Sequence, residues 1–130
     1  MDQPAKKVLI VDDEPALLKM MGVYLKRKGH NVTTLDSTDK AWETFAASGG
    51  EFTAVVLDAT MSGLSAHDLA LRLLAGDPAI CVILASGYPV DMTRLAEAGP
   101  GSVEFLQKPF TPESLDGTLR RMIASQEKAV

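Results

Sequence analysis

Four apolar runs in the sequence are each followed by side chains that could take part in chemistry. These side chains are Asp12 and Asp13 after residues 8–11, Asp58 after 54–57, Ser86 after 80–84 and Lys108 after 103–106. If the runs are parallel strands, their carboxyl ends share one edge of a sheet, where open α/β sheets bind ligands. We therefore expect three carboxylates, a hydroxyl and an ammonium group to converge on one site.

Three carboxylates placed together repel one another unless a cation lies among them. Mg²⁺ suits such a group, because it accepts one or two carboxylates and keeps waters and phosphate oxygens as further ligands. A carboxylate beside the ion can act as a nucleophile toward phosphorus and form an acyl phosphate. Lys108 would neutralise one phosphate oxygen and the Ser86 hydroxyl would hydrogen-bond another. The residue types therefore predict a phosphoryl-transfer site.

Each of these residues also has a structural explanation when taken alone. An acidic pair after a strand is commonly a turn or a helix cap, and Ser86 before Gly87 is an ordinary turn residue. Lysine before proline is equally commonplace. The coincidence favours function, because four separate strand ends each supply a residue type that one phosphoryl site needs.

Strands and helices must alternate to position these side chains. Continuous apolar runs are typical of strands buried on both faces of a parallel sheet, so we expect strands over 8–11, 54–57, 80–84 and 103–106, with a shorter one over 31–35. Helical spacing and capping signals predict five helices. They run from Pro15 to about Lys28, from a cap at Ser37 or Thr38 to the break at Ser48, from Ser65 to Ala75, from Pro89 to Ala98, and onward from Thr111–Glu113.

This alternation predicts a doubly wound α/β fold: a five-stranded parallel sheet covered by five helices through right-handed crossovers. With 130 residues, the chain is expected to be a single domain over residues 1–130, with its core over about 6–124. Only nine residues follow Arg121, so no output domain is expected after the last helix.

Composition and charge exclude several classes of function. The net charge of −4 and the lack of a clustered basic surface argue against nucleic acid as a partner. The single cysteine, Cys81, can form neither a disulfide framework nor a thiolate metal site, which favours a reducing, cytoplasmic setting. No apolar stretch approaches the roughly 20 residues that span a bilayer, so we expect no membrane insertion.

Four motifs resemble those of the receiver domains of two-component response regulators. They are VLIVDDEP at 8–15, VVLDATM at 55–61, VILASGY at 82–88 and FLQKPF at 105–110. The resemblance covers nearly the whole chain and implies the flavodoxin-like receiver fold. The segments around Ser86 and Lys108 resemble receivers at the end of hybrid histidine kinases in particular, so the chain is either a stand-alone receiver or part of such a kinase.

The resemblance also implies roles for individual residues. Asp58 would be the phosphoacceptor, with Asp13 as a direct Mg²⁺ ligand and Asp12 acting on the metal largely through water. The backbone carbonyl of Thr60 would be a further metal ligand beside Asp58. Ser86 and Lys108 would hold the phosphoryl group, Phe105 would be the aromatic whose rotamer follows the phosphorylation state, and the bond between Lys108 and Pro109 would be cis.

The implied function is a phosphorelay switch and not a classical enzyme. A histidine kinase or a histidine phosphotransfer domain would supply the phosphoryl group, and the receiver would catalyse its own Mg²⁺-dependent phosphorylation and its slow dephosphorylation. Phosphorylation would draw Ser86 toward the phosphate and let Phe105 move inward. The face formed by the fourth helix, fifth strand and fifth helix would then change its preference for a downstream protein target.

Two positions depart from the family pattern. The usual proline four residues after the phosphoacceptor is Ser62 here, and the glycine four residues further on is Ala66. These changes affect the loop after Asp58 and touch none of the reacting groups.

Three other functions compete with this interpretation. A phosphatase of the haloacid dehalogenase group needs a second aspartate two residues after its nucleophile, whereas Asp12 is followed there by Glu14 and Asp58 by Thr60. A flavodoxin-like nucleotide binder needs a glycine- or hydroxyl-rich loop after the first strand, where this chain has acidic residues that repel phosphate. A scaffold that is never phosphorylated is disfavoured because every polar site residue is present.

The remaining polar and aromatic residues predict structural roles. Trp42 and Phe45 are expected in the core, and His30 and His67 are expected to be solvated. The methionines Met20, Met21 and Met61 are expected to fill gaps in the core.

Overall fold

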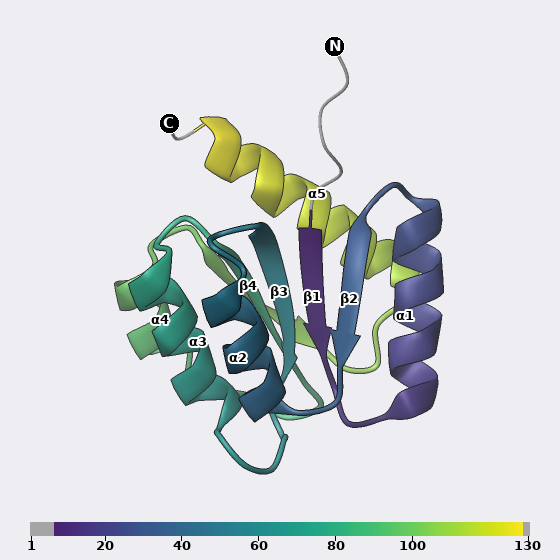
Figure 1. Cartoon of the computed structure of the whole chain (residues 1–130), viewed down its shortest axis with the longest axis horizontal. Helices are drawn as coiled ribbons and strands as arrows, with labels where there is room; N and C mark the ends of the chain where they lie inside the picture. Colours follow the sequence, from purple (N-terminus) through teal and green to yellow (C-terminus); the bar gives the residue numbers. More distant parts are fainter. Residues whose placement is uncertain (1–6, 129–130) are drawn as a thin grey trace.

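The structure is a computed structural model that describes residues 7–128, so position 6 of the expected core lies outside the described residues. A central sheet lies between two layers of helices (Figure 1). The strands are β1 (Lys7–Val11), β2 (Asn31–Leu35), β3 (Phe52–Asp58), β4 (Cys81–Ser86) and β5 (Val103–Gln107). The helices are α1 (Pro15–Arg27), α2 (Thr38–Ala47), α3 (Ala66–Gly76), α4 (Thr93–Ala98) and α5 (Pro112–Lys128).

All five strands are parallel and lie in the order β2-β1-β3-β4-β5. The predicted doubly wound fold is therefore confirmed. The order reverses at β1, because β2 lies on one side of it and all later strands lie on the other. Ligands of such sheets bind outside the carboxyl ends of the strands at this reversal. In this chain the position lies between the ends of β1 and β3, which Asp12 and Asp58 occupy.

The sheet divides the core into two apolar clusters, one on each face. Alternate residues of β1 point to opposite faces, so Leu9 and Val11 pack with α2, α3 and α4, whereas Val8 and Ile10 pack with α1 and α5. The central strands are buried almost completely on both sides. This double burial explains why they are continuous apolar runs, and it gives the strand ends a rigid base.

The helix starts follow local capping chemistry. The hydroxyls of Ser37 and Ser65 accept hydrogen bonds from the backbone amides of Lys40 and Asp68, at 3.3 and 3.0 Å. Proline occupies the first position of α1, where its missing amide costs nothing. Among residues 7–128, no helix is long and apolar enough to cross a membrane.

The predicted start of the fourth helix is wrong. Residues 89–92 form a loop, and α4 begins at Thr93 instead of Pro89. The Asp91 carboxylate accepts hydrogen bonds from the amide and the hydroxyl of Thr93, the first residue of the helix, at 3.0 and 2.6 Å. The other predicted element boundaries agree to within two residues, apart from the end of α5, which the sequence left open.

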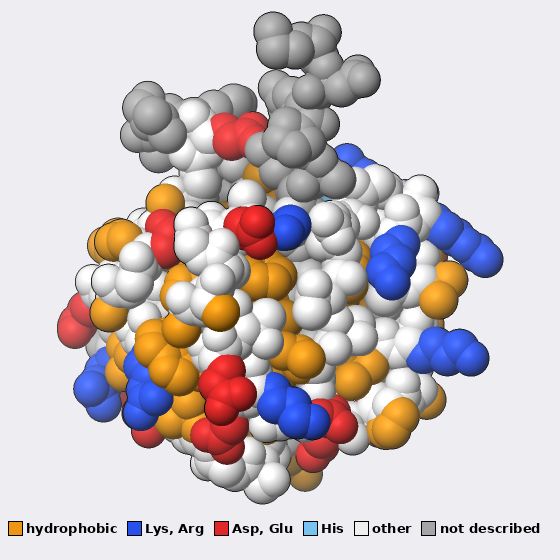
Figure 2. All heavy atoms as spheres, viewed as in Figure 1, with side chains coloured by type: hydrophobic (Ala, Val, Ile, Leu, Met, Phe, Trp, Pro, Cys, Tyr) orange, Lys and Arg blue, Asp and Glu red, His pale blue; other side chains and the backbone are white. Residues whose placement is uncertain are grey.

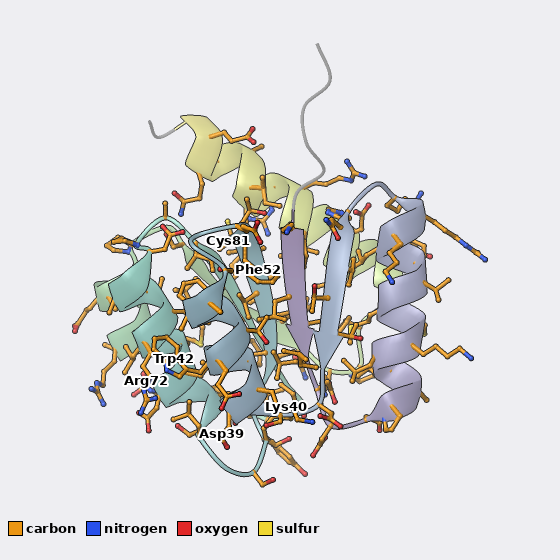
Figure 3. The ribbon with its side chains drawn as sticks, viewed as in Figure 1. Asp39, Lys40, Trp42, Phe52, Arg72 and Cys81 are labelled. Atoms are coloured by element: carbon orange, nitrogen blue, oxygen red, sulfur yellow. The ribbon has the colours of Figure 1, made fainter. Side chains whose placement is uncertain are left out.

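The aromatic residues of α2 pack as expected, although Trp42 is only half-buried. Phe45 is buried, and its ring centroid lies 6.0 Å from that of Trp42. The Arg72 guanidinium of α3 lies 5.6 Å from the centre of the Trp42 ring, which joins the two helices at the surface (Figure 3). Such a cation–π contact adds stability at an exposed site, and it suggests no ligand.

Cys81 lies at the start of β4, with 1% of its surface exposed (Figure 3). Burial and, secondarily, the charge of Asp77 raise the pKa of its thiol to about 11. The thiol is therefore protonated and unreactive at neutral pH.

His30 was expected to be solvated, and that expectation is wrong. Its Nε2 lies 2.8 Å from Oδ1 of Asp116 on α5, and both residues are buried. Arg120 donates from Nε to both oxygens of Asp116 and from Nη2 to the carbonyl of Lys28. The partner of His30 is 86 positions away in the sequence, so no local pattern could reveal this network.

Asp116→Asn is expected to lower the free energy of unfolding by about 2 kcal/mol at pH 7, the scale of buried hydrogen bonds to a charged group. Burial would raise the pKa of Asp116, but the hydrogen bonds from His30 and Arg120 outweigh it and hold the pKa below its ordinary value. A depressed pKa gives stability that is present above the unfolded pKa of about 3.9 and is lost as the pH falls through the folded value. The difference between variant and wild type should therefore shrink below about pH 4 in urea denaturation.

The control for this measurement is Glu104→Gln, which breaks the exposed pair of Glu104 with Arg121. Exposed pairs contribute about 1 kcal/mol or less. If the two variants lose the same free energy of unfolding, the buried network of Asp116 stabilises the fold no more than an exposed ion pair does.

Candidate functional site

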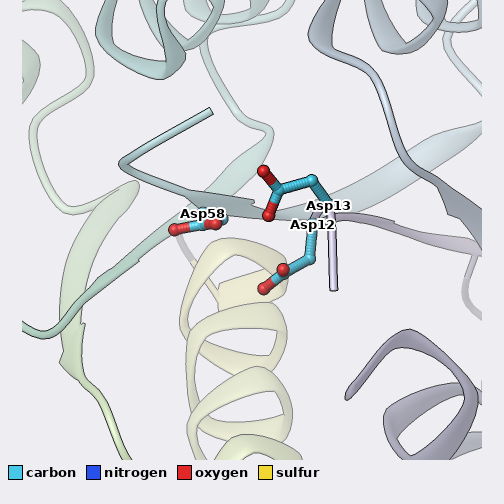
Figure 4. A group of neighbouring side chains, drawn as sticks. All are labelled: Asp12, Asp13 and Asp58. Carbon is cyan, nitrogen blue, oxygen red and sulfur yellow. The ribbon is translucent and has the colours of Figure 1, made fainter. Parts of the chain in front are cut away.

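The three predicted carboxylates converge at the carboxyl edge of the sheet. Asp12 and Asp13 follow β1, Asp58 ends β3, and one oxygen from each lies within 4.8 Å of the others (Figure 4). Asp12 and Asp58 are buried, with 3% and 4% of their surface exposed, whereas Asp13 is exposed. Two buried carboxylates so close together need a compensating charge.

Lys108 supplies that charge from the loop after β5. Its Nζ lies 2.9 Å from Oδ2 of Asp12 and 3.4 Å from Oδ1 of Asp58. Burial acts to lower the pKa of Lys108, but the hydrogen bond and charge of Asp12 and the charge of Asp58 outweigh burial, so the pKa is raised. A raised pKa keeps the side chain charged at neutral pH. The attraction of Lys108 for the two carboxylates is lost only when the pH rises through the raised pKa of Lys108, which lies above the unfolded pKa of about 10.4.

The backbone around Lys108 fixes where its ammonium group lies. The Lys108 amide donates to the carbonyl of Ser86 at 2.8 Å, which extends the pairing of β4 with β5 by one hydrogen bond. The bond between Lys108 and Pro109 is cis, as the family resemblance implies. The Lys108 backbone is therefore tied to the end of β4.

Thr60 approaches Asp58 from the turn after β3. Its amide and its hydroxyl both donate to Oδ1 of Asp58, at 3.2 and 3.1 Å. The hydrogen bond from the Thr60 hydroxyl to Asp58 was not predicted from the sequence. A hydroxyl residue two positions after an aspartate is the local signal that could have indicated it, because aspartate commonly binds backbone groups two residues on.

The loop after Asp58 is held without the family's proline. The carbonyl of Ser62 accepts a hydrogen bond from the buried Thr38 hydroxyl at 3.4 Å. Gly63 follows with φ of +84°, and a Cβ there would lie 2.9 Å from a carboxylate oxygen of Asp39. Ala66, at the other departure from the family pattern, is buried in the first turn of α3. The start of α2 thus fixes the shape of this loop.

Ser86 and Phe105 occupy neighbouring strands. Ser86 is buried at the end of β4, and its hydroxyl accepts a hydrogen bond from the Tyr88 amide at 3.0 Å. The residue before it, Ala85, is the register partner of Asp58. Phe105 is half-buried on the edge strand β5, opposite Leu84. The structure therefore places Ser86 next to the acidic edge and Phe105 on the outer side of the same strand pair.

The donor set fits a small divalent cation. Two ligand oxygens on opposite sides of an octahedral Mg²⁺ ion are about 4.2 Å apart, so the 4.8 Å cluster needs only a small contraction. The two oxygens of Asp12 already accept hydrogen bonds, from the Glu14 amide at 3.0 Å and from Lys108 at 2.9 Å. Asp13 has no hydrogen bond recorded among the described residues, and its carboxylate can turn toward an ion.

Two apolar grooves lie along α1, and one of them reaches Lys108. One is lined by Glu14, Leu17, Met20, Lys108, Pro109 and Phe110. The other is lined by Ala16, Lys19, Met20, Val23, Tyr24, Arg27 and Pro112. Met20 belongs to both grooves and is 44% exposed, so its predicted place in the core is wrong. Lys and Arg side chains gather over α1, at the right of Figure 2.

Comparison with known proteins decides the family. The response regulator receiver domain family matches residues 8–120 of this chain. The chain belongs to the response regulator receiver domain family. A receiver domain is a phospho-accepting switch in two-component signalling and not a classical enzyme, and its acidic pocket here is Asp12, Asp13 and Asp58. Membership implies a histidine kinase as partner, and it decides against the phosphatase and the nucleotide binder.

Curated relatives of this receiver domain include regulators and a kinase. The chain is 28% identical over 121 residues to the DNA-binding transcriptional regulator NtrC of Rhizobium meliloti (strain 1021), covering 93% of the chain and 25% of that protein. It is 33% identical over 121 residues to the sensor kinase CckA of Brucella abortus (strain 2308), covering 92% of the chain and 13% of that protein. The chain thus spans a small part of either relative.

Solved structures of receiver domains share the fold. A response regulator receiver domain protein from Clostridium thermocellum superposes with a TM-score of 0.83 at 25% identity, covering 96% of this chain and 99% of that one. The BeF3-activated DrrB receiver domain superposes with a TM-score of 0.74 at 26% identity, covering 92% of this chain and 98% of that one.

Proposed function

We propose that residues 6–124 act as one receiver unit in which Asp58 accepts a phosphoryl group from a phosphohistidine. The donor is a histidine kinase or a histidine phosphotransfer domain. The observation that carries this proposal is the Lys108 ammonium, which contacts both Asp12 and Asp58 beside the exposed Asp13. This arrangement provides a carboxylate nucleophile and a fixed positive charge for the phosphoryl oxygens at one sheet edge.

In the proposed step, an oxygen of Asp58 attacks phosphorus in line with the P–N bond of the donor. An O–P bond forms, the P–N bond breaks, and its electron pair returns to the imidazole nitrogen, which is left neutral or takes a proton. Lys108 moves its hydrogen bonding from Asp58 to a phosphoryl oxygen. The Ser86 hydroxyl, which now accepts from the Tyr88 amide, donates to another.

Mg²⁺ is the proposed cofactor. When bound, it neutralises the charge that gathers on the phosphoryl oxygens and the carboxylates. The exposed Asp13 is the proposed direct ligand, with Asp58 and the backbone carbonyl of Thr60. Asp12 is proposed to act on the metal largely through water, and its two oxygens accept hydrogen bonds from Glu14 and Lys108.

The phosphodonor is proposed to dock on α1. The donor must bring phosphorus within bonding distance of Asp58, so it has to cover the surface beside Lys108. One groove begins there and shares Met20 with a second groove further along α1, which Lys19 and Arg27 line. An amphipathic helix with acidic flanks, which carries the phosphohistidine, fits this surface. The similarity to CckA supports a receiver within a hybrid kinase.

We propose that phosphorylation changes the surface formed by α4, β5 and α5, and that this change passes the signal on. When Ser86 turns toward the phosphoryl group, Phe105 has room to move from its half-buried position toward the sheet. The bidentate pair of Arg121 with Glu104, at 2.7 Å, ties α5 to β5 next to Phe105. A downstream protein that contacts this face would therefore bind the two states with different affinities, which is what a switch requires.

Incubation with phosphoramidate and Mg²⁺ should add one phosphoryl group to the wild-type protein and none to Asp58→Asn, as read by intact mass. EDTA should slow the labelling by about tenfold or more, since one lost electrostatic contact to the transition state has that scale. Asp36→Asn, at an exposed carboxylate outside the cluster, is the control and should label normally. Labelling of Asp58→Asn, or unchanged labelling in EDTA, would contradict the proposed site.

Met20→Glu should slow transfer from a phosphorylated histidine phosphotransfer domain by about tenfold, because interface anchors commonly contribute more than 1 kcal/mol. Labelling by phosphoramidate should not change, since the small donor needs no docking surface. Ala46→Glu, on the exposed side of α2 across the sheet, is the matched control. An equal effect of both variants would remove α1 as the docking face.

Beryllofluoride with Mg²⁺ should shift the ¹⁹F resonance of Phe105 in protein labelled with fluorophenylalanine. Resonances of Phe45 and Phe52, which are buried in the apolar cluster of α2, α3 and α4 and do not belong to β5, serve as internal references. Ser86→Ala should reduce the shift, because the proposed coupling passes through that hydroxyl. If the Phe105 resonance does not move, the proposed coupling of phosphorylation to Phe105 is wrong. The proposal that Asp58 is phosphorylated would not be affected.

A further inference from the structure

The turn after β3 is held at both of its ends. At its start, the Thr60 amide donates a hydrogen bond to Oδ1 of Asp58 at 3.2 Å. At its end, the carbonyl of Ser62 accepts a hydrogen bond from the Thr38 hydroxyl at 3.4 Å. The carbonyl of Thr60, which is a proposed metal ligand, lies between these two contacts in the chain.

The contact at the far end comes from a different element, the start of α2. Thr38 is the first residue of that helix, and 0% of its surface is exposed. Within residues 7–128, its hydrogen bond is the one recorded to the backbone of residues 61–64. The next residue of α2, Asp39, lies against Gly63, where a Cβ would be 2.9 Å from a carboxylate oxygen (Figure 3). The start of α2 therefore holds the end of the turn.

We propose that Thr38 is a positioning residue for Mg²⁺, because its hydroxyl holds the turn in the shape that aims the Thr60 carbonyl at the ion. This inference rests on the proposed function, in which that carbonyl is a metal ligand. The carbonyl turns with the whole peptide plane between Thr60 and Met61, so its direction is fixed only when both ends of the turn are held. Without the hydrogen bond from Thr38, ion binding would have to order the turn as well, and this entropic cost would weaken binding.

The Thr38 hydroxyl is neutral, and its recorded hydrogen bond goes to the Ser62 carbonyl and not to a carboxylate. Its removal therefore leaves every charged group of the acidic pocket in place. The expected effect is on the affinity for the ion and not on the chemistry of the acceptor once the ion is bound.

Thr38→Val is the test, because valine keeps the branched shape and removes the hydroxyl. Mn²⁺ is the probe, since it takes the same oxygen ligands as Mg²⁺ and the free ion is counted directly by EPR. The dissociation constant of Mn²⁺ should rise roughly fivefold, which corresponds to about 1 kcal/mol, the scale of one net hydrogen bond. Thr38→Ser, which keeps the hydroxyl, should bind Mn²⁺ as the wild type does.

Thr53→Val is the matched control. The Thr53 hydroxyl donates to the carbonyl of Lys7 at 3.1 Å, at the amino end of the sheet, so the same substitution removes a similar hydrogen bond far from the acidic pocket. Thr53→Val should leave the Mn²⁺ affinity unchanged.

A second substitution tests whether Thr38 acts through the shape of the turn. Ser62→Pro, added to Thr38→Val, should restore the Mn²⁺ affinity, because the proline ring restricts the backbone of the turn without help from α2. No hydrogen bond of the Ser62 amide is recorded among the described residues, so the proline removes none. Affinity that stays low in the double variant would show that Thr38 does not act by holding the turn.

Two further results would overturn the inference. One is equal Mn²⁺ affinity in wild type and Thr38→Val, and the other is an equal loss in Thr53→Val, which would assign the effect to lower overall stability. Thr38→Ala repeats the measurement if the valine variant unfolds early in thermal melts. If wild type binds Mn²⁺ and Asp13→Asn does not, the proposed metal site stands whatever Thr38→Val does. If wild type binds no Mn²⁺, the proposed metal site is wrong and this inference fails with it.

Discussion

The attraction between Lys108 and the carboxylates of Asp12 and Asp58 is the interaction on which the rest of the structure depends. Lys108 and Asp12 are 96 positions apart in the sequence, yet their charged atoms are 2.9 Å apart. Only a fold that brings the ends of β1, β3 and β5 to one edge can achieve this. Parallel strands joined by helical crossovers do so, because every strand then ends on the same side of the sheet.

Keeping such a charged edge in place requires rigidity elsewhere. The two apolar clusters, one on each face, immobilise the central strands, so the polar residues at their ends have little freedom to separate. The start of α2 then fixes the loop after Asp58 through Thr38 and Gly63, where this chain lacks the family's proline. A different contact thus performs the same task, which explains how Ser62 is tolerated beside the reacting groups.

Residue types and their periodicity were enough to predict the sheet, most element boundaries and the cluster of Asp12, Asp13, Asp58 and Lys108. These features depend on short-range patterns and on the rule that parallel strands share an edge. The partners of His30 and the exposure of Met20 could not be predicted, because both depend on how α1 and α5 pack beside each other on one face of the sheet. The Thr60 contact had a local signal, a hydroxyl residue two positions after an aspartate, that was not used. The late start of α4 was missed because Pro89 favours a helix start at its own position, whereas the helix begins at Thr93, which donates to Asp91.

The burial of Cys81 has a practical consequence. It is the one cysteine of the chain, it lies inside the sheet, and its raised pKa leaves almost no thiolate at neutral pH. Reagents that attack thiols therefore have no native target on the folded surface. A cysteine introduced on α1 or α5 would carry a fluorophore or spin label by itself, which makes the domain a clean background for measuring the distance from either helix to a bound partner.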